Sequence, residues 1–191
     1  ISQDEEGTLR AFRMHRAELI DPLITDHGGR IANTPGDSYL LEFASAVDAV
    51  LCARAFQTGM VLRNETVPED RRLRFRVGLN VGDIIIDGDD IQGDGVNIAA
   101  RLEGLAEPGG ICISGTVYDQ VHGKLDCGFV DMGEQMVKNM AAPLRAYQVT
   151  DTGDGAMAPN RASPSGKNRT VAIAMAIAIL AVATCGTIIM H

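Results

Sequence analysis

The uncharged run near the C-terminus restricts what this chain can fold into more than any other feature. Residues 171–190 read VAIAMAIAILAVATCGTIIM, and about 20 apolar residues suffice for an α-helix to cross a bilayer. Lys167 and Arg169 precede the run, and positive charge favours the cytoplasmic side. We therefore predict one transmembrane helix in the inner or plasma membrane, with residues 1–170 in the cytoplasm. A helix buried in a protein core is the alternative.

The residues before this run divide into a long mixed segment and a short polar one. Residues 150–170 are dominated by Gly, Pro, Ser and Asn, which predicts a flexible linker. Residues 1–149 are long enough to bury a core of their own. The expected organisation is one globular domain, one linker and one membrane segment over residues 171–190.

The charge and the cysteines exclude several classes of function. The net charge is −8, and an acidic chain is a poor ligand for nucleic acid because phosphate neutralisation supplies most of that affinity. The four cysteines show no CxxC spacing, so we expect reduced thiols and neither a zinc site nor a redox site.

Hydrophobic periodicity within residues 1–149 alternates between helical and extended patterns. Apolar residues recur at helical spacing over residues 5–27 and from Ser45, a predicted helix cap, to about Asn64. RIANT, SYLLEF and LRFRVGLN have the composition or the alternation of strands. Because hairpins are mixed with helices without a strict βαβ order, we predict an α+β sandwich.

The segment DDIQGDGVNIAARLE, residues 89–103, combines residue types that suit phosphate chemistry. Asn97 and Arg101 are four residues apart, so a helix places both on one face. Arginine offers a fixed fork of donors to a phosphate, and asparagine can orient a nucleophile, which suits an anionic transition state at phosphorus. Asp90 can accept a hydrogen bond from an amino group such as that of adenine. In the alternative, Asn97 caps the helix and Arg101 pairs with Glu103 or Glu107.

Asp37 is a second candidate, in a predicted turn between the strands RIANT and SYLLEF. It follows Pro35 and Gly36, and a carboxylate at such a turn can bind a hard cation. The alternative is that Asp37 serves only the turn itself.

Three stretches of the sequence resemble the catalytic domain of the class III nucleotidyl cyclases, the adenylate and guanylate cyclases. The most specific is the motif G-x-x-V-N-x-A-x-R, from Gly93 to Arg101, within RFRVGLNVGDIIIDGDDIQGDGVNIAARLEGLAEPGGICIS. HGGRIANTPGDSYLLEF and MGEQMVKNMAAPLRAYQV resemble the metal hairpin and the closing strands of that family. The similarity covers roughly residues 4–149. It implies a ferredoxin-like βαββαβ core, with active sites at a head-to-tail dimer interface.

The resemblance also implies a reaction and roles for individual residues. The expected reaction converts ATP into 3′,5′-cyclic AMP and pyrophosphate with two Mg²⁺ or Mn²⁺ ions per site, in a homodimer or with another cyclase as partner. Asp37 would bind metal, Asn97 would orient the ribose, and Arg101 would stabilise charge on the transferring phosphoryl group. Asp90 would contact the adenine amine and Lys138 the terminal phosphates. In the alternative, Lys138 is a solvated surface lysine.

Two departures from the family pattern leave alternatives open. Asn33 lies where the family has a base-recognition lysine, and an asparagine brings no charge and reaches less far. The first strand of the family, which carries the other metal aspartate, would lie before Ile1, so we expect a cyclase sandwich that lacks its first strand, in the middle of the sheet. A catalytically incomplete module that regulates or dimerises, and a guanylate cyclase, are the alternative functions.

Overall fold

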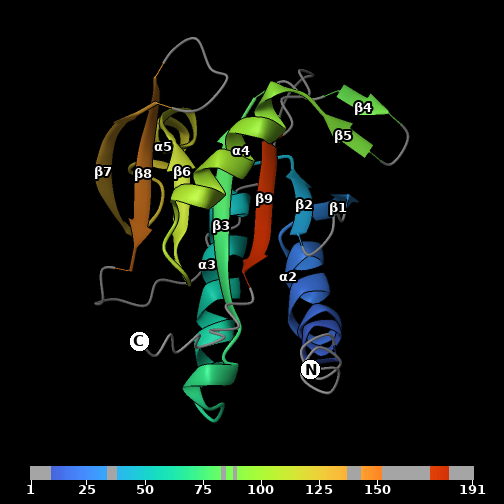
Figure 1. The fold of residues 1–191 in the computed structure, drawn as a ribbon. Helices are drawn as coiled ribbons and strands as arrows, with labels where there is room; N and C mark the ends of the chain where they lie inside the picture. Colours follow the sequence, from blue (N-terminus) through green and yellow to red (C-terminus); the bar gives the residue numbers. More distant parts are fainter. Residues whose placement is uncertain are drawn as a thin grey trace, which may run out of the picture.

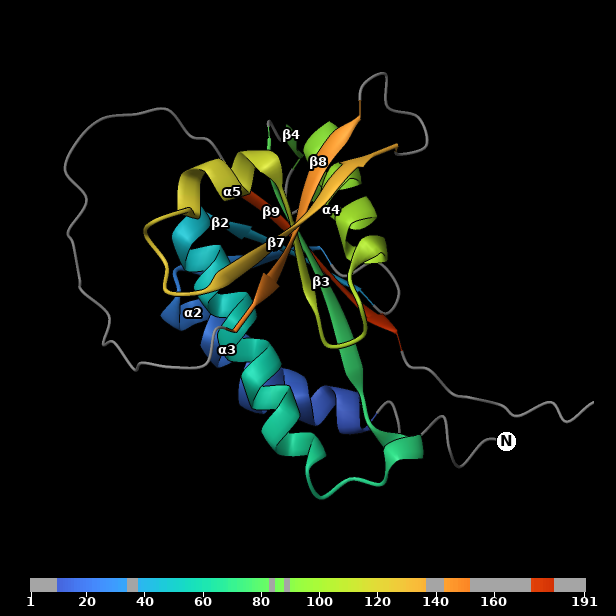
Figure 2. The same cartoon turned by 90° about the vertical axis from the view of Figure 1, so that its left-hand side faces the viewer.

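A mixed seven-stranded sheet with helices on both faces organises the chain. The computed structural model describes residues 10–33, 38–82, 85–87, 90–136, 143–151 and 173–180, and describes only the backbone at Asn33, 85–87, 90–92 and 173–180. The sheet has the strand order β1-β2-β9-β3-β6-β8-β7, and β4 pairs with β5 in a separate hairpin. Helix α4 covers one face, and α2, α3 and α5 cover the other (Figures 1 and 2). The predicted α+β sandwich is confirmed.

The elements have the following bounds. The strands are β1 (Gly29–Asn33), β2 (Ser38–Phe43), β3 (Arg74–Val81), β4 (Ile85–Asp87), β5 (Asp90–Gln92), β6 (Ile111–Ser114), β7 (Gly128–Gln135), β8 (Leu144–Thr150) and β9 (Ile173–Leu180). The helices are α2 (Asp21–Asp26), α3 (Ala46–Asn64), α4 (Asp94–Leu105) and α5 (Gly115–Val121), with a π-helical turn η1 (Arg16–Ile20) and a 3-10 turn η2 (Glu69–Arg71).

Two of the helices begin at a serine cap that satisfies a free backbone N–H of the first turn. Ser45 Oγ accepts a hydrogen bond from the backbone N–H of Asp48 at the start of α3, at 3.3 Å. Ser114 Oγ accepts from the N–H of Val117 at the start of α5, at 3.4 Å. Such caps stabilise a helix by about 1 kcal/mol. The predicted start of α3 at Ser45 is thereby confirmed.

The buried thiols behave as core residues. Cys52 and Cys112 are buried and unpaired, and burial raises the pKa of Cys52 to about 12 and that of Cys112 to about 11. A thiol with so high a pKa carries almost no thiolate at neutral pH and is unreactive. The expectation of reduced structural thiols holds for these two residues.

Strand β3 has the alternation that its sequence predicts. Leu73, Phe75, Val77 and Leu79 are all buried, with exposed fractions of 8% or less, in the core beneath α3. The other face of β3 changes character along its length, because Arg74 and Arg76 are followed by Gly78, Asn80 and Gly82. This second face is the one on which α4 lies.

Helix α4 lies directly on the backbone of β3. A Cβ atom built on Gly78 would overlap the carbonyl oxygen of Ala99 and the backbone nitrogen of Glu103. One built on Gly82 would lie 3.1 Å from the Cα of Gly95. No side chain separates helix from strand at these points, so the position of α4 is fixed by backbone contact.

We expect Gly78→Ala to destabilise the protein by about 1–3 kcal/mol, because a methyl group forced between two backbones must displace one of them. Urea unfolding followed by circular dichroism measures this change. Gly104→Ala, in α4, is the matched control, since a Cβ atom at that position would have nothing within 4 Å. It should stabilise the protein by about 0.5 kcal/mol through helix propensity. Equal effects of the two substitutions would contradict the close contact of α4 with β3.

The predicted transmembrane helix is wrong where the structure describes that segment. Residues Ile173–Leu180 form β9, which pairs antiparallel with both β2 and β3. The register sets Ser38 opposite Ala178, and Ala178 opposite Arg76. A strand in a sheet that is covered on both faces is typically a continuous apolar run, which is also the composition of a membrane helix. No helix among the described residues is long and apolar enough to cross a membrane.

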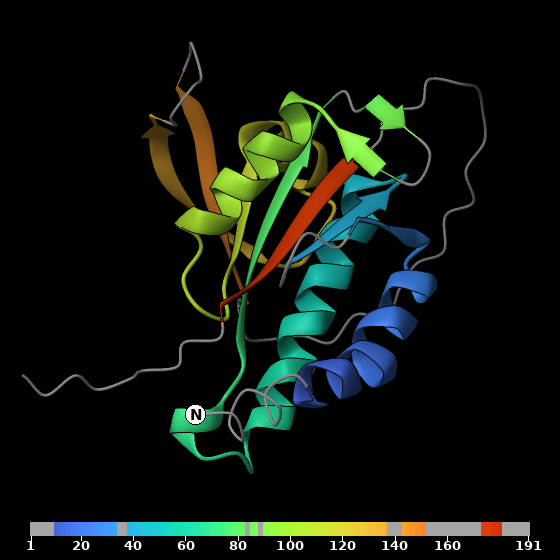
Figure 3. The same cartoon turned by 45° about the vertical axis from the view of Figure 1, so that its right-hand side comes forward.

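The middle of the large sheet is therefore complete. We expected a missing strand there, and the structure places β9 between β2 and β3 instead (Figure 3). The eight residues of β9 include no acidic side chain, so this strand brings no carboxylate to the centre of the sheet.

Candidate active site on helix α4

Asn97 and Arg101 share the solvent-facing side of α4, as the sequence predicts. Ala99 and Leu102, on the opposite side of the helix, have exposed fractions of 0%. Asn97 and Arg101 are both exposed. The helix therefore presents an amide and a guanidinium together on a surface whose position is fixed by the strand below it.

The simpler interpretations of these two residues do not fit the structure. The N-cap of α4 is Gly93, with φ 135°, a backbone conformation that favours glycine. Asn97 is not a cap, since it lies inside the helix. Within the part of the chain that the structure describes, Arg101 forms no ion pair with Glu107. Both side chains are available to a ligand or to another chain.

A buried amide that the sequence analysis did not single out anchors the first turn of α4. Asn80, on β3, is 2% exposed, and its Nδ2 donates a hydrogen bond to the carbonyl oxygen of Gly95 at 3.2 Å. The change of one strand face from arginine to Gly78, Asn80 and Gly82 is the pattern that marks this contact in the sequence. A polar residue between two glycines on a face covered by a helix has a backbone group as its natural partner.

The end of β1 lies next to the same helix. Ala32 packs in one buried cluster with Leu40 and Ala99, against which Val96 also lies. Asn33 follows Ala32 in the chain and Asn97 follows Val96, so each asparagine is a sequence neighbour of this cluster. The candidate base-contacting residue Asn33 and the candidate ribose-contacting residue Asn97 are thus brought to one region.

The backbone of Asp90 reaches this region from the small hairpin. Asp90 begins β5 and pairs with Asp87 of β4. Strand β5 contacts both β1 and α4, and the hairpin projects beyond the start of α4 in Figures 1 and 3. Strand β5, which begins at Asp90, thus contacts both α4 and β1, the strand that ends at Asn33.

Asp37 and Lys138 lie outside the described residues, so the structure does not test their positions. Ser38, which follows Asp37, begins β2. Among the described residues there is no group of three or more His, Cys, Asp and Glu side chains that could hold a metal ion. Asp37, the metal ligand that the sequence predicts, is not among the residues to which this finding applies.

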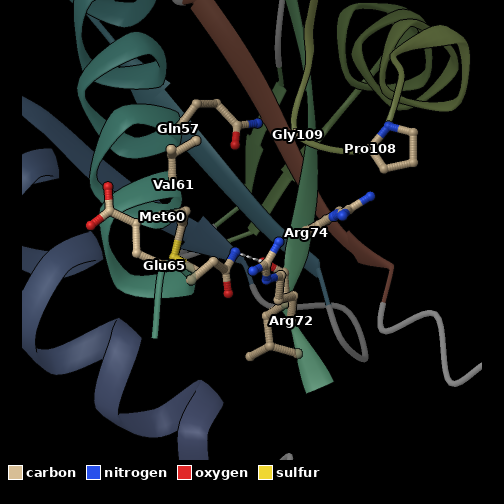
Figure 4. A pocket seen from close by; sticks show the side chains of 10 residues that line it. Gln57, Met60, Val61, Glu65, Arg72, Arg74, Pro108 and Gly109 are labelled. Atoms are coloured by element: carbon tan, nitrogen blue, oxygen red, sulfur yellow. Dashed lines mark hydrogen bonds between the residues drawn. The ribbon is translucent and has the colours of Figure 1, made fainter. Parts of the chain in front are cut away.

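A separate pocket opens at the other end of β3. It has a volume of about 510 Å³ and lies between the C-terminal half of α3, the start of β3 and the turn at Pro108–Gly109 (Figure 4). Its two amide donors already have backbone partners. Gln57 donates to the carbonyls of Phe75 and Gly110, and Asn64 donates to that of Leu73. None of the predicted site residues lines this pocket, so it is not the candidate active site.

The sequence matches a known family over most of the chain. Residues 8–180 match the family described as "Adenylate and Guanylate cyclase catalytic domain". A protein of Rhizobium meliloti (strain 1021) that is named as an adenylate cyclase is 44% identical over 147 residues, which cover 77% of this chain and 25% of that protein. This chain thus spans about a quarter of the length of that relative.

Solved structures give the same result for the fold. A crystal structure described as an adenylate/guanylate cyclase/hydrolase from Silicibacter pomeroyi has a TM-score of 0.74 and 42% identity, and the match covers 76% of this chain and 85% of that one. The adenylyl cyclase CyaB from P. aeruginosa has a TM-score of 0.59 and 25% identity, over 77% of this chain and 82% of that one.

Proposed function

Because the chain belongs to the adenylate and guanylate cyclase catalytic domain family, we propose that it converts ATP into 3′,5′-cyclic AMP and pyrophosphate. The observation that carries the proposal is the pairing of Asn97 and Arg101 on the exposed side of α4, inside the motif that begins at Gly93. Among the described residues, neither side chain has a partner that would have to be given up before it binds a nucleotide.

Arg101 supplies charge and geometry in this proposal. A guanidinium donates from a planar fork that matches two phosphate oxygens at once. In cyclisation, negative charge develops on the oxygens around the α-phosphorus as the 3′-oxygen attacks and pyrophosphate leaves. A donor fixed at that position stabilises the transition state more than the ground state, which is the requirement for a higher kcat.

Asn97 holds the ribose while the reaction proceeds. Its amide can donate to a ribose oxygen and accept from a hydroxyl group, which orients the 3′-oxygen toward the α-phosphorus. The bound ribose then holds the 3′-oxygen in the geometry for attack, which free ATP seldom adopts. An error of about 1 Å in this position can lower the rate about 100-fold. The stiff attachment of α4 to β3 suits that task.

Adenine is the proposed base because of Asp90. A carboxylate accepts a hydrogen bond from the exocyclic amine of adenine, whereas guanine presents an oxygen at the same position of the ring. The backbones of Asp90 and Asn33 lie on strands β5 and β1, which contact each other, and this contact supports one base bound by both residues. A guanylate cyclase is the alternative, and the ratio of the two products decides between them.

A dimer is proposed because Asn97 and Arg101 are exposed on α4 and so are open to a second chain. Two copies arranged head to tail would set α4 of one copy against the β1–β2 hairpin of the other, and so bring Asn97 and Arg101 toward the partner's Asp37. Such a site is complete only at the interface, and the pocket in Figure 4 plays no part in it.

The proposal includes divalent cations, and Asp37 is the one residue that it assigns to bind them. The described residues contain no carboxylate cluster that fits a metal ion, and β9 brings no acidic residue to the centre of the sheet. The roles of Arg101 and Asn97 given above therefore do not depend on a metal position. When bound, Mg²⁺ or Mn²⁺ would neutralise phosphate charge and activate the 3′-hydroxyl.

Two of these observations also favour one alternative function: the described residues contain no carboxylate cluster for a metal ion, and β9 contains no acidic residue. A cyclase-fold module without a complete metal site would dimerise and lend Asn97 and Arg101 to another cyclase, and would have no activity alone. Addition of this chain to a complete cyclase would then raise the activity of that cyclase.

Incubation of the protein with ATP or GTP, in the presence of Mn²⁺ or Mg²⁺, tests the proposal. We expect cyclic AMP and pyrophosphate in equal amounts, with cyclic GMP far below cyclic AMP, and we expect EDTA to abolish both products. Chromatography of the nucleotides and a pyrophosphate assay measure them. A larger yield of cyclic GMP would support the guanylate cyclase, and no product together with stimulation of a second cyclase would support the module.

A further inference from the structure

Asn80 differs from the other buried polar residues because its hydrogen bond joins strand β3 to helix α4. Among the described residues, three polar side chains are buried: Gln57, Asn80 and Ser114. Gln57 links two backbone carbonyls of the core, and Ser114 caps α5. Asn80 instead reaches out of β3 to a helix that carries the candidate site.

The acceptor of this hydrogen bond lies in the first turn of α4. Nδ2 of Asn80 donates to the carbonyl oxygen of Gly95 at 3.2 Å, two residues before Asn97. A helical carbonyl accepts from the N–H of residue i+4, and its second lone pair remains available for a side-chain donor. The bond therefore joins strand and helix without replacing any bond within the helix.

The start of α4 needs such an anchor because it has no side-chain cap. Gly93, the N-cap, offers no side chain to the free N–H groups of the first turn, and helix ends without caps open most readily. Gly82 leaves room for the contact, since a Cβ there would lie 3.1 Å from Gly95 Cα and 3.2 Å from Nδ2 of Asn80. Asn80 thus donates a hydrogen bond to the uncapped end of α4, and Gly82 allows the two backbones to approach each other there.

We propose that Asn80 is a positioning residue for the cyclase reaction, which holds the first turn of α4 through the Gly95 carbonyl and so fixes Asn97 against the ribose. This inference rests on the function proposed above. Asn80 does not touch the nucleotide, because it is buried beneath the helix. Its loss should lower kcat while KM changes little, since alignment in the transition state is lost and phosphate contacts are kept.

Asn80→Leu and Asn80→Ala test the proposal in a double-mutant cycle with Asn97→Ala. Leucine keeps a branched side chain of similar shape but cannot donate. We expect each Asn80 variant to lower kcat by about 10-fold to 100-fold in the wild-type background. In the Asn97→Ala background we expect almost no further loss, because residues that act through one another are not additive. A full further loss in that background, or a wild-type kcat in the single variants, would overturn the proposal.

Ser114→Ala is the control for a general loss of stability. Ser114 is equally buried and also bonds a helix end, but on α5 at the opposite face of the sheet. It should lower the melting temperature without a change in the kcat of the folded protein. A fall in kcat equal to that of Asn80→Leu would show that any buried polar group has the same effect.

Hydrogen exchange separates a failure of this inference from a failure of the proposed function. In Asn80→Leu the hydrogen-bonded amides of residues 96–99 should exchange about fivefold faster, as expected for loss of one hydrogen bond, while those of α5 stay unchanged. Unchanged exchange in residues 96–99 would overturn the positioning role whether or not the protein makes cyclic AMP. Faster exchange in the variant of a protein that makes no cyclic nucleotide would leave the anchor in place and refute the reaction.

Discussion

Arg101→Ala is expected to lower kcat for cyclic AMP formation by about 10²–10³-fold, the usual effect of removing one donor that stabilises transition-state charge. Arg101 is exposed on a helix whose other side is fully buried, so its loss leaves no cavity and the fold should be unchanged. Steady-state kinetics with ATP, together with the melting temperature, measure the two effects separately. Arg101→Lys should recover only part of the activity, because a point charge replaces a planar fork.

Arg71→Ala provides the matched control for the loss of a positive charge. Arg71 is also exposed, in the turn η2 at the far end of β3. Its substitution should leave kcat and KM within about twofold of the wild type, since an exposed charge at that distance is screened by salt. If Arg101→Ala and Arg71→Ala had the same small effect, Arg101 would have no role in the reaction.

Mixing two inactive variants should restore activity if the site lies between subunits. Asp37→Asn and Arg101→Ala would each be inactive as homodimers, since each removes one half of both symmetric sites. In a mixed dimer one site receives both substitutions and the other receives neither. Random pairing of equal amounts therefore predicts about a quarter of the wild-type activity, measured on co-expressed protein before the mixed dimers are separated from the homodimers.

A second mixture shows whether the recovery has this cause. Asn97 and Arg101 lie on the same helix, so Asn97→Ala and Arg101→Ala should not complement each other. Every site in that mixed dimer would contain one substitution. Recovery in both mixtures, or in neither, would contradict a site shared between α4 of one copy and Asp37 of the other.

Predictions from local sequence patterns were correct where one face of a helix or strand is buried. The alternation of Phe75, Val77 and Leu79 placed β3 correctly because a strand with one core face must keep a period of two. Ser45 placed the start of α3 because a cap is a contact between residues three apart. Asn97 and Arg101 were placed on one side of α4 for the same reason, since helical spacing is local.

The segment at residues 173–180 shows what such patterns leave open. An unbroken apolar run fits a membrane helix and also fits a strand covered on both faces, and its length of about 20 residues favours the helix. The pairing of β9 with β2 and β3 depends on residues far away in the chain, which no local periodicity reports. Asn80 was missed similarly, because its partner Gly95 belongs to another element.

The position of β9 also sets the order in which the sheet can form during synthesis. Its residues follow those of every other described strand, yet it lies in the middle of the sheet and pairs Ser38 with Ala178 and Arg74 with Leu180. At about 5–20 residues per second of translation, β2 and β3 leave the ribosome well before their common neighbour. Until then each has an unpaired apolar edge, which is the form of a strand most prone to pair with another chain. Nascent chains arrested ahead of residue 173 are therefore the species in which aggregation of this protein should begin.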